Sequence, residues 1–373
     1  MIHPSLFYQC LHDEGVDFFA GVPDSLLKHF CTFIRQNVPA DNNIITQNEG
    51  GAVALAAGHY LATGHLPLVY MQNSGIGNAV NPLLSLADPE VYSLPMLLLI
   101  GYRGEPGVHD EPQHKKQGMV TPALIEAMRY PCFILDSESA EIIRQTKEAI
   151  RIAKEQKTPV ALVVRKGLFE EIPPLRAESN LELTREDALE ELSKLPGVLV
   201  STTGFTSREL FEIRERRQEG HERDFLTVGS MGHSSMIALG IISLVHPDLP
   251  VTCIDGDGAF LMHLGAIAIL GKRKPGNFTH IVINNGVHDS VGGQPTDIGA
   301  LDLIKLASAA GYQKIDSVST REELHQILSD KSSDFRFIEV KVRPGARKDL
   351  GRPTTTPQGN RDALMNFIKN TSK

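Results

Sequence analysis

Short apolar runs alternate with longer stretches of helical composition along both halves of the chain. The runs have the length of buried strands, and the stretches between them are rich in helix-forming residues. Strands that alternate with helices form parallel sheets, because each crossover helix returns the chain to the same end of the sheet. The pattern therefore predicts an α/β fold with a mostly parallel sheet, flanked by helices, in each half.

The same pattern places the individual elements. In the first half we predict helices over residues 6–14, 52–62 and 140–154, and strands over 18–20, 68–70, 95–100, 132–135 and 159–164. In the second half we predict strands over 197–201, 224–228, 251–254, 280–283 and 335–342.

A polar segment with two prolines, residues 172–180, separates the halves and has the composition of a linker. A chain of 373 residues is also long for one domain. We therefore predict a first domain over residues 1–175 and a second over 182–373.

One strand–helix–strand unit in the second half carries polar residues at its strand ends. Asp257, within a Gly-Asp-Gly triplet, follows one strand, Asn285 follows the next, and a helix is expected over 259–270. Both side chains should then lie at the carboxyl edge of the sheet, where α/β proteins bind ligands. Their oxygens suit a hard cation such as Mg²⁺, and the glycines let a phosphate approach backbone N–H groups. Two ordinary glycine-rich turns are the alternative.

A second segment of interest, residues 48–64, is rich in glycine and alanine, which let a helix pack closely on a neighbour. Glu49 stands at the expected helix start, where the helix dipole favours a carboxylate. Taken alone, such a glutamate is a common first-turn charge.

Composition limits the class of partner. The 37 basic and 45 acidic residues give a net charge of −8, which argues against a nucleic-acid partner. No apolar run has the length of a membrane span, so no membrane partner is expected. The four cysteines form no CxxC pair and favour buried thiols in a reducing compartment, which predicts a soluble, cytoplasmic protein.

Taken together, the Gly-Asp-Gly triplet, the Asn-Asn pair and the glutamate-led helix resemble the thiamine diphosphate-dependent enzymes. The resemblance implies that Mg²⁺ bridges protein and cofactor diphosphate, with Asp257, Asn285 and the main-chain carbonyl of Val287 as ligands. It also implies that Glu49 hydrogen-bonds a ring nitrogen of the aminopyrimidine, so that the exocyclic nitrogen becomes a base. A buried carboxyl with a raised pKa suits that sharing of a proton.

The resemblance extends to two more turns of the second half. It implies that Met231 holds the cofactor in its folded shape and that the Gly229 carbonyl accepts a hydrogen bond from the aminopyrimidine. Thr203 would contact the diphosphate. Core packing for Met231 and a helix N-cap for Thr203 are the alternatives. The implied cofactor-binding residues are Glu49, Thr203, Gly204, Gly229, Met231, Gly256, Asp257, Gly258, Ala259 and Asn285.

Glu49 and Asp257 belong to different halves, yet the same cofactor must contact both. In the resembled family the cofactor spans the two domain types at a subunit interface. The resemblance therefore implies a homodimer or a higher homo-oligomer with active sites at the subunit interface.

Residues 21–28, 103–114, 285–294 and 347–357 look like the corresponding segments of the phosphonopyruvate decarboxylase family, to which the sulfopyruvate decarboxylases are closely related. The implied activity is that of a carboxy-lyase in phosphonate biosynthesis, which converts phosphonopyruvate to phosphonoacetaldehyde and CO₂. Clustered cations suit the phosphonate group of this substrate, although a solvated charge run is the alternative. The cations are Arg347, Lys348 and Arg352.

Further polar residues complete the predicted active site. Asp24 and Ser25 match the place where related decarboxylases have an acidic residue near the reacting carbon, and Ser290 would donate a hydrogen bond to the substrate. His109 and His114 would orient the carboxylate or relay protons, although surface histidines are as common. The candidate catalytic residues are Asp24, Ser25, Glu49, His109 and His114, and the candidate substrate ligands are Asp24, Ser25, Ser290, Arg347, Lys348 and Arg352.

Other functions stay open at this point. Sulfopyruvate is the nearest alternative substrate. Carboligation of the acetolactate synthase type is disfavoured because the connector is too short to hold a middle domain. A non-catalytic thiamine diphosphate-binding protein is disfavoured because it has no need of Glu49. NAD binding is excluded because no G-x-G-x-x-G with a downstream acidic residue follows a strand.

Overall fold

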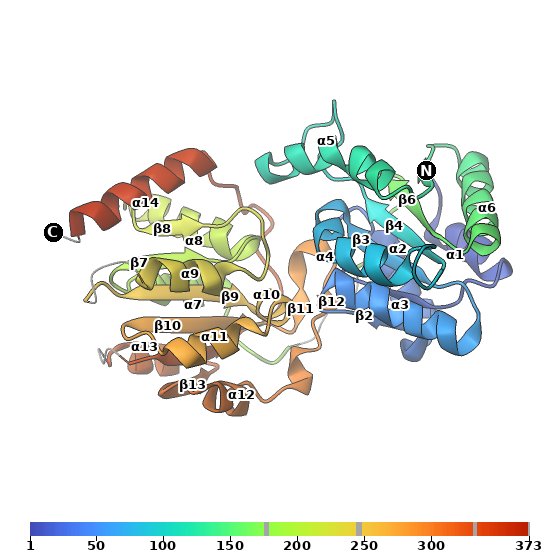
Figure 1. The fold of residues 1–373 in the computed structure, drawn as a ribbon. Helices are drawn as coiled ribbons and strands as arrows, with labels where there is room; N and C mark the ends of the chain where they lie inside the picture. Colours follow the sequence, from blue (N-terminus) through green and yellow to red (C-terminus); the bar gives the residue numbers. More distant parts are fainter. Residues whose placement is uncertain (175–178, 244–247, 331–333, 372–373) are drawn as a thin grey trace. The chain divides into compact units, whose positions relative to one another are not determined.

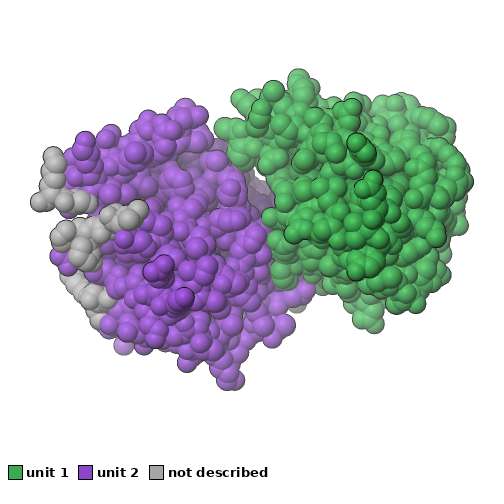
Figure 2. Space-filling view, in the orientation of Figure 1, with its two compact units in different colours: residues 1–176, 291–294 green, residues 177–290, 295–373 purple. Residues whose placement is uncertain are grey.

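The computed structural model describes residues 1–174, 179–243, 248–330 and 334–371. These residues form two six-stranded sheets flanked by helices (Figure 1), and every strand pairing described within them is parallel, which confirms the predicted fold class. Contacts divide the chain into unit 1, residues 1–176 with 291–294, and unit 2, residues 177–290 with 295–373 (Figure 2). Part of the predicted linker, residues 175–178, lies outside the described residues.

The sheet of unit 1 has the strand order β2-β1-β3-β4-β6-β5. Successive residues of a strand face opposite sides, so each strand contributes to two helix layers. On β4, Leu97 and Leu99 pack with α1, α2 and α6, whereas Leu98 and Ile100 pack with α3, α4 and α5. The strands are β1 Phe19–Gly21, β2 Asn43–Ile45, β3 Leu68–Gln72, β4 Met96–Gly101, β5 Cys132–Ile134 and β6 Pro159–Val164. The helices are α1 Pro4–Asp13, α2 Lys28–Asn37, α3 Glu49–Thr63, α4 Ile76–Pro82, α5 Pro112–Ala127 and α6 Ser139–Gln156, with the short turns η1 Ala40–Asn42, η2 Asn73–Gly75 and η3 Leu83–Ala87.

The sheet of unit 2 has the order β13-β14-β10-β9-β7-β8 and the same three-layer construction (Figure 1). The strands β9 and β10 are parallel neighbours, as predicted, and Ile283 is paired with Gly256. The strands of this sheet are β7 Val198–Ser201, β8 Asp224–Leu226, β9 Val251–Gly256, β10 Phe278–Asn284, β13 Lys314–Val318 and β14 Arg336–Lys341. A separate two-stranded sheet consists of β11 Val287–His288 and β12 Gln294–Pro295. The helices are α7 Arg185–Leu192, α8 Phe205–Arg216, α9 Ser234–Ile242, α10 Asp257–Met262, α11 Ala266–Arg273, α12 Leu303–Ala310, α13 Arg321–Leu328 and α14 Pro357–Thr371, with the short turns η4 Asp289–Val291 and η5 Ile298–Ala300.

The predicted helix over 259–270 is wrong in one respect, because the structure divides this stretch between α10 and α11. His263 leaves the helical conformation with φ −130°, and Gly265 precedes the new helix. Glycine has a low helix propensity, so interrupting the helix at Gly265 costs little free energy. Two edge strands, β2 and β13, were not predicted, because short or half-exposed strands lack a long apolar run.

No helix within the described ranges combines the length and the apolar character that crossing a bilayer requires.

One prediction concerns the packing of α11 against α12. A Cβ at Gly271 would lie 1.7 Å from the carbonyl oxygen of Ala310, so these helices approach each other through a glycine. Gly271→Ala should lower the free energy of unfolding by about 1–3 kcal/mol, because backbone must move to admit the methyl group. Gly240→Ala, in α9, meets nothing within 4 Å and should be neutral or stabilising by up to about 1 kcal/mol. Urea unfolding of both variants checks this, and equal midpoints would contradict it.

Candidate active site

The carboxyl edge of the unit 2 sheet brings the Gly-Asp-Gly turn and the Asn-Asn turn together. Asp257 is the first residue of α10 and is 3% exposed. Its Oδ1 accepts a hydrogen bond from Gly258 N at 2.7 Å, and its Oδ2 accepts from Gly286 N at 2.7 Å and from Thr296 Oγ1 at 3.2 Å. Burial raises the pKa of Asp257 to about 6, and these hydrogen bonds oppose the rise. The carboxylate is thus fixed against the turn that carries Asn285.

Asn285 is held on both ends of its side-chain amide. Its Nδ2 donates to Asp289 Oδ2 at 2.7 Å, and its Oδ1 accepts from Val287 N at 3.1 Å. The turn therefore offers a carboxylate from Asp257, an amide oxygen and main-chain carbonyls. These are hard oxygen donors, and the set fits Mg²⁺.

Gly258 lies under two larger side chains. A Cβ at this position would lie 2.5 Å from His288 Cε1 and 3.3 Å from the terminal methyl group of Met231. The structure thus brings Met231 to the Gly-Asp-Gly turn. The Nε2 atom of His288 is buried and has no hydrogen-bond partner among the described residues, and burial lowers the pKa of His288 to about 4. A neutral imidazole therefore offers one unused polar atom beside this turn.

Three more predicted cofactor residues lie in loops at the same edge. Thr203 and Gly204 connect β7 to α8, and Gly229 lies between β8 and α9. Because β7 pairs in parallel with both β8 and β9, all these loops follow carboxyl ends of adjacent strands. Gly204 has φ 95°, which favours glycine. Of the remaining predicted cofactor residues in unit 2, Gly256 ends β9 and Ala259 is buried in α10.

In unit 1, Glu49 begins α3 and is 5% exposed. Its Oε2 accepts a hydrogen bond from Asn78 Nδ2 at 2.7 Å. Its Oε1 lies against Gly75, where a Cβ would approach to 2.3 Å. Burial raises the pKa of Glu49, and the hydrogen bond from Asn78 opposes that rise. The carboxyl is therefore poised to take up a proton more readily than an exposed glutamate.

Asp24 follows β1 and is fully buried. Its Oδ1 accepts from Leu26 N at 2.9 Å, and its Oδ2 accepts from Gln72 Nε2 at 2.8 Å. A Cβ at Gly101 would lie 2.1 Å from Asp24 Oδ1, so the carboxylate occupies space that a glycine leaves at the end of β4. The neighbouring Ser25 Oγ accepts from Arg103 Nη1 at 2.7 Å.

Arg103 was not singled out from the sequence, although it lies within the segment 103–114 that carried the family resemblance. Its guanidinium donates to Asp110 through Nε at 2.8 Å and Nη2 at 2.5 Å. His114, in the first turn of α5, is buried, and its Nδ1 has no partner among the described residues. Burial and then the nearby Arg103 lower the pKa of His114, which favours a neutral ring. His109 is exposed in the preceding loop.

The predicted basic residues lie in one loop between β14 and α14. Arg347 forms ion pairs with Glu186, Glu212 and Asp349, so carboxylates already surround its charge. Lys348 and Arg352 are exposed, as is Ser290. The three cations therefore share one loop, and the charge of Arg347 is used in ion pairs with side chains of the same unit.

Comparison with known proteins finds a matching family model in each half of the chain. Residues 4–124 match the thiamine pyrophosphate enzyme, N-terminal TPP binding domain, and residues 203–340 match the corresponding C-terminal TPP binding domain. The chain is 34% identical over 364 residues to a phosphonopyruvate decarboxylase of Streptomyces viridochromogenes, an alignment that spans 92% of this chain and 89% of the relative. A phosphonopyruvate decarboxylase of Streptomyces hygroscopicus is 35% identical over 379 residues, or 96% and 92% of the two chains.

A sulfopyruvate decarboxylase of Methanosarcina acetivorans is 27% identical over 365 residues, which is 90% of each chain. The similarity thus extends over both units and confirms the two thiamine diphosphate-binding domains and the carboxy-lyase class that the sequence predicted. On this ground, the chain belongs to the phosphonopyruvate decarboxylase family of thiamine diphosphate-dependent decarboxylases.

Proposed function

We propose that this chain decarboxylates phosphonopyruvate to phosphonoacetaldehyde and CO₂ in phosphonate biosynthesis, with thiamine diphosphate and Mg²⁺ as cofactors. The observation that carries the proposal is the buried Glu49 carboxyl, whose raised pKa suits a proton-sharing role, in a chain 34–35% identical to two phosphonopyruvate decarboxylases. Such a carboxyl is expected in a working enzyme and has no purpose in a protein that only binds the cofactor.

The bound cofactor supplies a nucleophilic carbon and an electron sink for decarboxylation. Glu49 would hold its proton against a ring nitrogen of that cofactor. The hydrogen bond from Asn78 occupies Oε2, which leaves Oε1 for this contact. Burial keeps water from competing for the proton, and this supports the assigned role.

Unit 2 would hold the diphosphate end of the cofactor. Asp257, Asn285 and the carbonyl of Val287 are the proposed Mg²⁺ ligands, since each offers an oxygen at the turns that follow β9 and β10. Gly258 has no side chain, which would let a phosphate approach the backbone at the start of α10, where the Gly258 N–H itself donates to Asp257 Oδ1. Met231 would support the cofactor from the neighbouring loop.

The substrate would be held and protonated by polar residues of unit 1. Asp24 and His114 are buried polar groups at the carboxyl edge of the unit 1 sheet, and we assign them and Ser25 to proton delivery and carboxylate binding. His109, which is exposed, is a further candidate for orienting the substrate carboxylate or relaying protons. Lys348 and Arg352 are the proposed ligands of the phosphonate group, with Arg347 as a third cation once its internal pairs rearrange.

The domain roles and the assembly complete the proposal. Residues 1–175 would bind the pyrimidine end and residues 182–373 the diphosphate end of the cofactor. Glu49 and Asp257 would then act on one cofactor in a homodimer or higher homo-oligomer, with active sites at the subunit interface. A cytoplasmic location stays a prediction.

Sulfopyruvate is a second candidate substrate because the similarity to a sulfopyruvate decarboxylase covers 90% of the chain. Phosphonate carries more negative charge than sulfonate, so cations at the head group should favour phosphonopyruvate.

Decarboxylation of phosphonopyruvate, sulfopyruvate and pyruvate should be compared side by side. We expect the highest kcat/KM for phosphonopyruvate and the lowest for pyruvate, which lacks the second anionic group. Coupled assay of each aldehyde product gives the ranking. A preference for pyruvate would refute the proposed head-group recognition.

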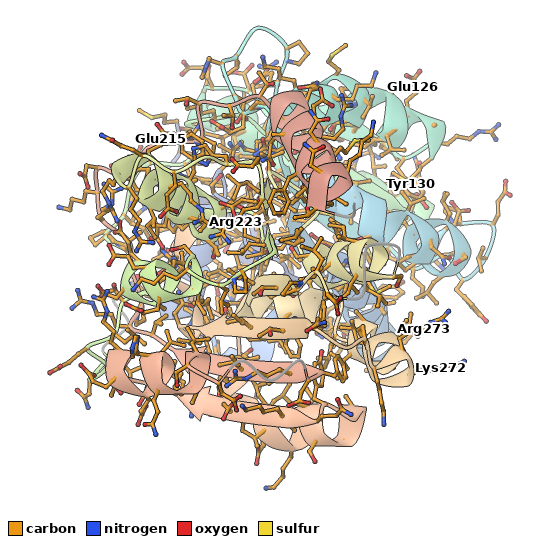
Figure 3. The ribbon with its side chains drawn as sticks, turned by 90° about the vertical axis from the view of Figure 1, so that its left-hand side faces the viewer. Glu126, Tyr130, Glu215, Arg223, Lys272 and Arg273 are labelled. Atoms are coloured by element: carbon orange, nitrogen blue, oxygen red, sulfur yellow. The ribbon has the colours of Figure 1, made fainter. Side chains whose placement is uncertain are left out.

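Replacement of Glu49 tests the proton-sharing role. Glu49→Gln keeps the shape of the side chain but cannot exchange a proton, so turnover should fall by at least about 100-fold. The matched control is Glu126→Gln on the exposed face of α5 (Figure 3), which should leave turnover unchanged. Equal turnover of Glu49→Gln and wild type would remove Glu49 from the mechanism.

Replacement of Asp257 tests the metal site. Asp257→Ala removes a charged ligand, so the Mg²⁺-dependent part of thiamine diphosphate binding should disappear. Calorimetric titration with and without Mg²⁺ measures that part directly. If the variant still binds the cofactor more tightly with Mg²⁺ than without it, the metal assignment is wrong.

A further inference from the structure

Asp289, a carboxylate without an assigned role, lies directly behind Asn285 in unit 2. It begins η4, and its side chain is surrounded by donors. Oδ2 accepts from Asn285 Nδ2 at 2.7 Å and from Arg185 Nη1 at 2.9 Å, and Oδ1 accepts from Gly345 N at 3.0 Å. Three donors from three separate segments therefore fix this one side chain.

The contacts of Asn285 require a single orientation of its amide. A carboxylate only accepts hydrogen bonds, and a backbone N–H only donates them. The contact with Asp289 therefore demands the NH₂ group, and the contact with Val287 N demands the oxygen. A flipped amide would place donor against donor at one end and acceptor against acceptor at the other.

Arg185, which donates to Asp289, is itself fixed by a buried ion pair. It begins α7 and is 5% exposed. Its Nε and Nη2 donate to Glu209 Oε2 and Oε1 at 2.8 Å and 2.9 Å, a bidentate pair with a carboxylate of α8 that is itself buried. Such a pair fixes the plane of the guanidinium. The remaining nitrogen, Nη1, is thereby directed at Asp289.

We propose that Asp289 is the positioning residue of the metal site, which sets the Asn285 amide so that its oxygen is the atom offered to Mg²⁺. The inference rests on the proposed metal site. A carbonyl-type oxygen has two lone pairs, and the contact from Val287 N uses one of them, which leaves one for a cation. Asp289 thus orients a metal ligand through a hydrogen bond without binding the metal itself. Through Gly345 it also ties the segment after β14 to the metal-binding turn.

Mg²⁺-dependent binding of thiamine diphosphate to the full chain, measured by calorimetry, tests the proposal. Asp289→Ala should weaken Mg²⁺ binding by about 10- to 100-fold, since the amide becomes free to rotate. The matched control is Asp316→Ala. Asp316 also accepts from a buried arginine, Arg336, at 3.1 Å and 2.8 Å. It lies on β13, and within the described part of the chain its hydrogen bonds do not involve Asn285. This control should keep wild-type affinity, and thermal unfolding without ligand reports the stability lost in each variant.

A double-mutant cycle separates orientation from general stability. In Asn285→Asp both side-chain oxygens accept, so no orientation has to be selected. Adding Asp289→Ala to this variant should therefore leave Mg²⁺ affinity unchanged to within about twofold, or raise it by removing a neighbouring like charge. A merely structural role for Asp289 predicts the same loss in both backgrounds, and that result would overturn the inference.

The Asp257→Ala and Asp289→Ala variants together distinguish a wrong metal site from a wrong role for Asp289. If Asp257→Ala retains Mg²⁺-dependent binding, the proposed metal site is wrong. If Asp257→Ala abolishes that binding while Asp289→Ala leaves it intact, the metal site stands and the positioning role is refuted.

Discussion

The parallel pairing of β9 with β10 is the constraint on which the arrangement of Asp257 and Asn285 at one edge of the unit 2 sheet depends. Their register places Gly256 opposite Ile283, so the turn after each strand emerges at the same edge. The carboxylate of Asp257 then reaches the backbone N–H of Gly286. A register shift of one residue would turn every side chain of the shifted strand to the opposite face of the sheet and separate these groups. The loops after β7 and β8 join the same edge because those strands continue the sheet in parallel.

Two buried carboxyl groups of unit 1 each occupy space that a glycine of another segment leaves open. Glu49 lies against Gly75, and Asp24 lies against Gly101. Each is also met by an amide donor, Asn78 for Glu49 and Gln72 for Asp24. Burial of a charged group is costly without such partners, so these contacts set the position of each side chain.

Sequence pattern alone located the two strands of the central strand–helix–strand unit, but not the division of its helix into α10 and α11. The spacing of apolar runs located β9 and β10, and the residue types at their ends predicted a metal and phosphate site. It was insufficient where local signal was weak. The half-exposed edge strand β13 has no apolar run, and the break between α10 and α11 depends on how one glycine and one histidine are accommodated. Arg103 was overlooked because its partner Ser25 is 78 positions away in the chain.

The sequence by itself determined the kinds of atom available to a cofactor, the parallel pairing of the strands and the family to which the chain belongs. These depend on periodicity and on spacing within single segments, which the chain carries locally. Only the tertiary structure decided which partner each polar group meets. Arg185 reaches Asp289 across 104 positions, and Arg347 is paired with carboxylates instead of standing open. Such pairings follow from the register of strands and the desolvation of buried charge, and neither is written in the spacing of residues along the chain.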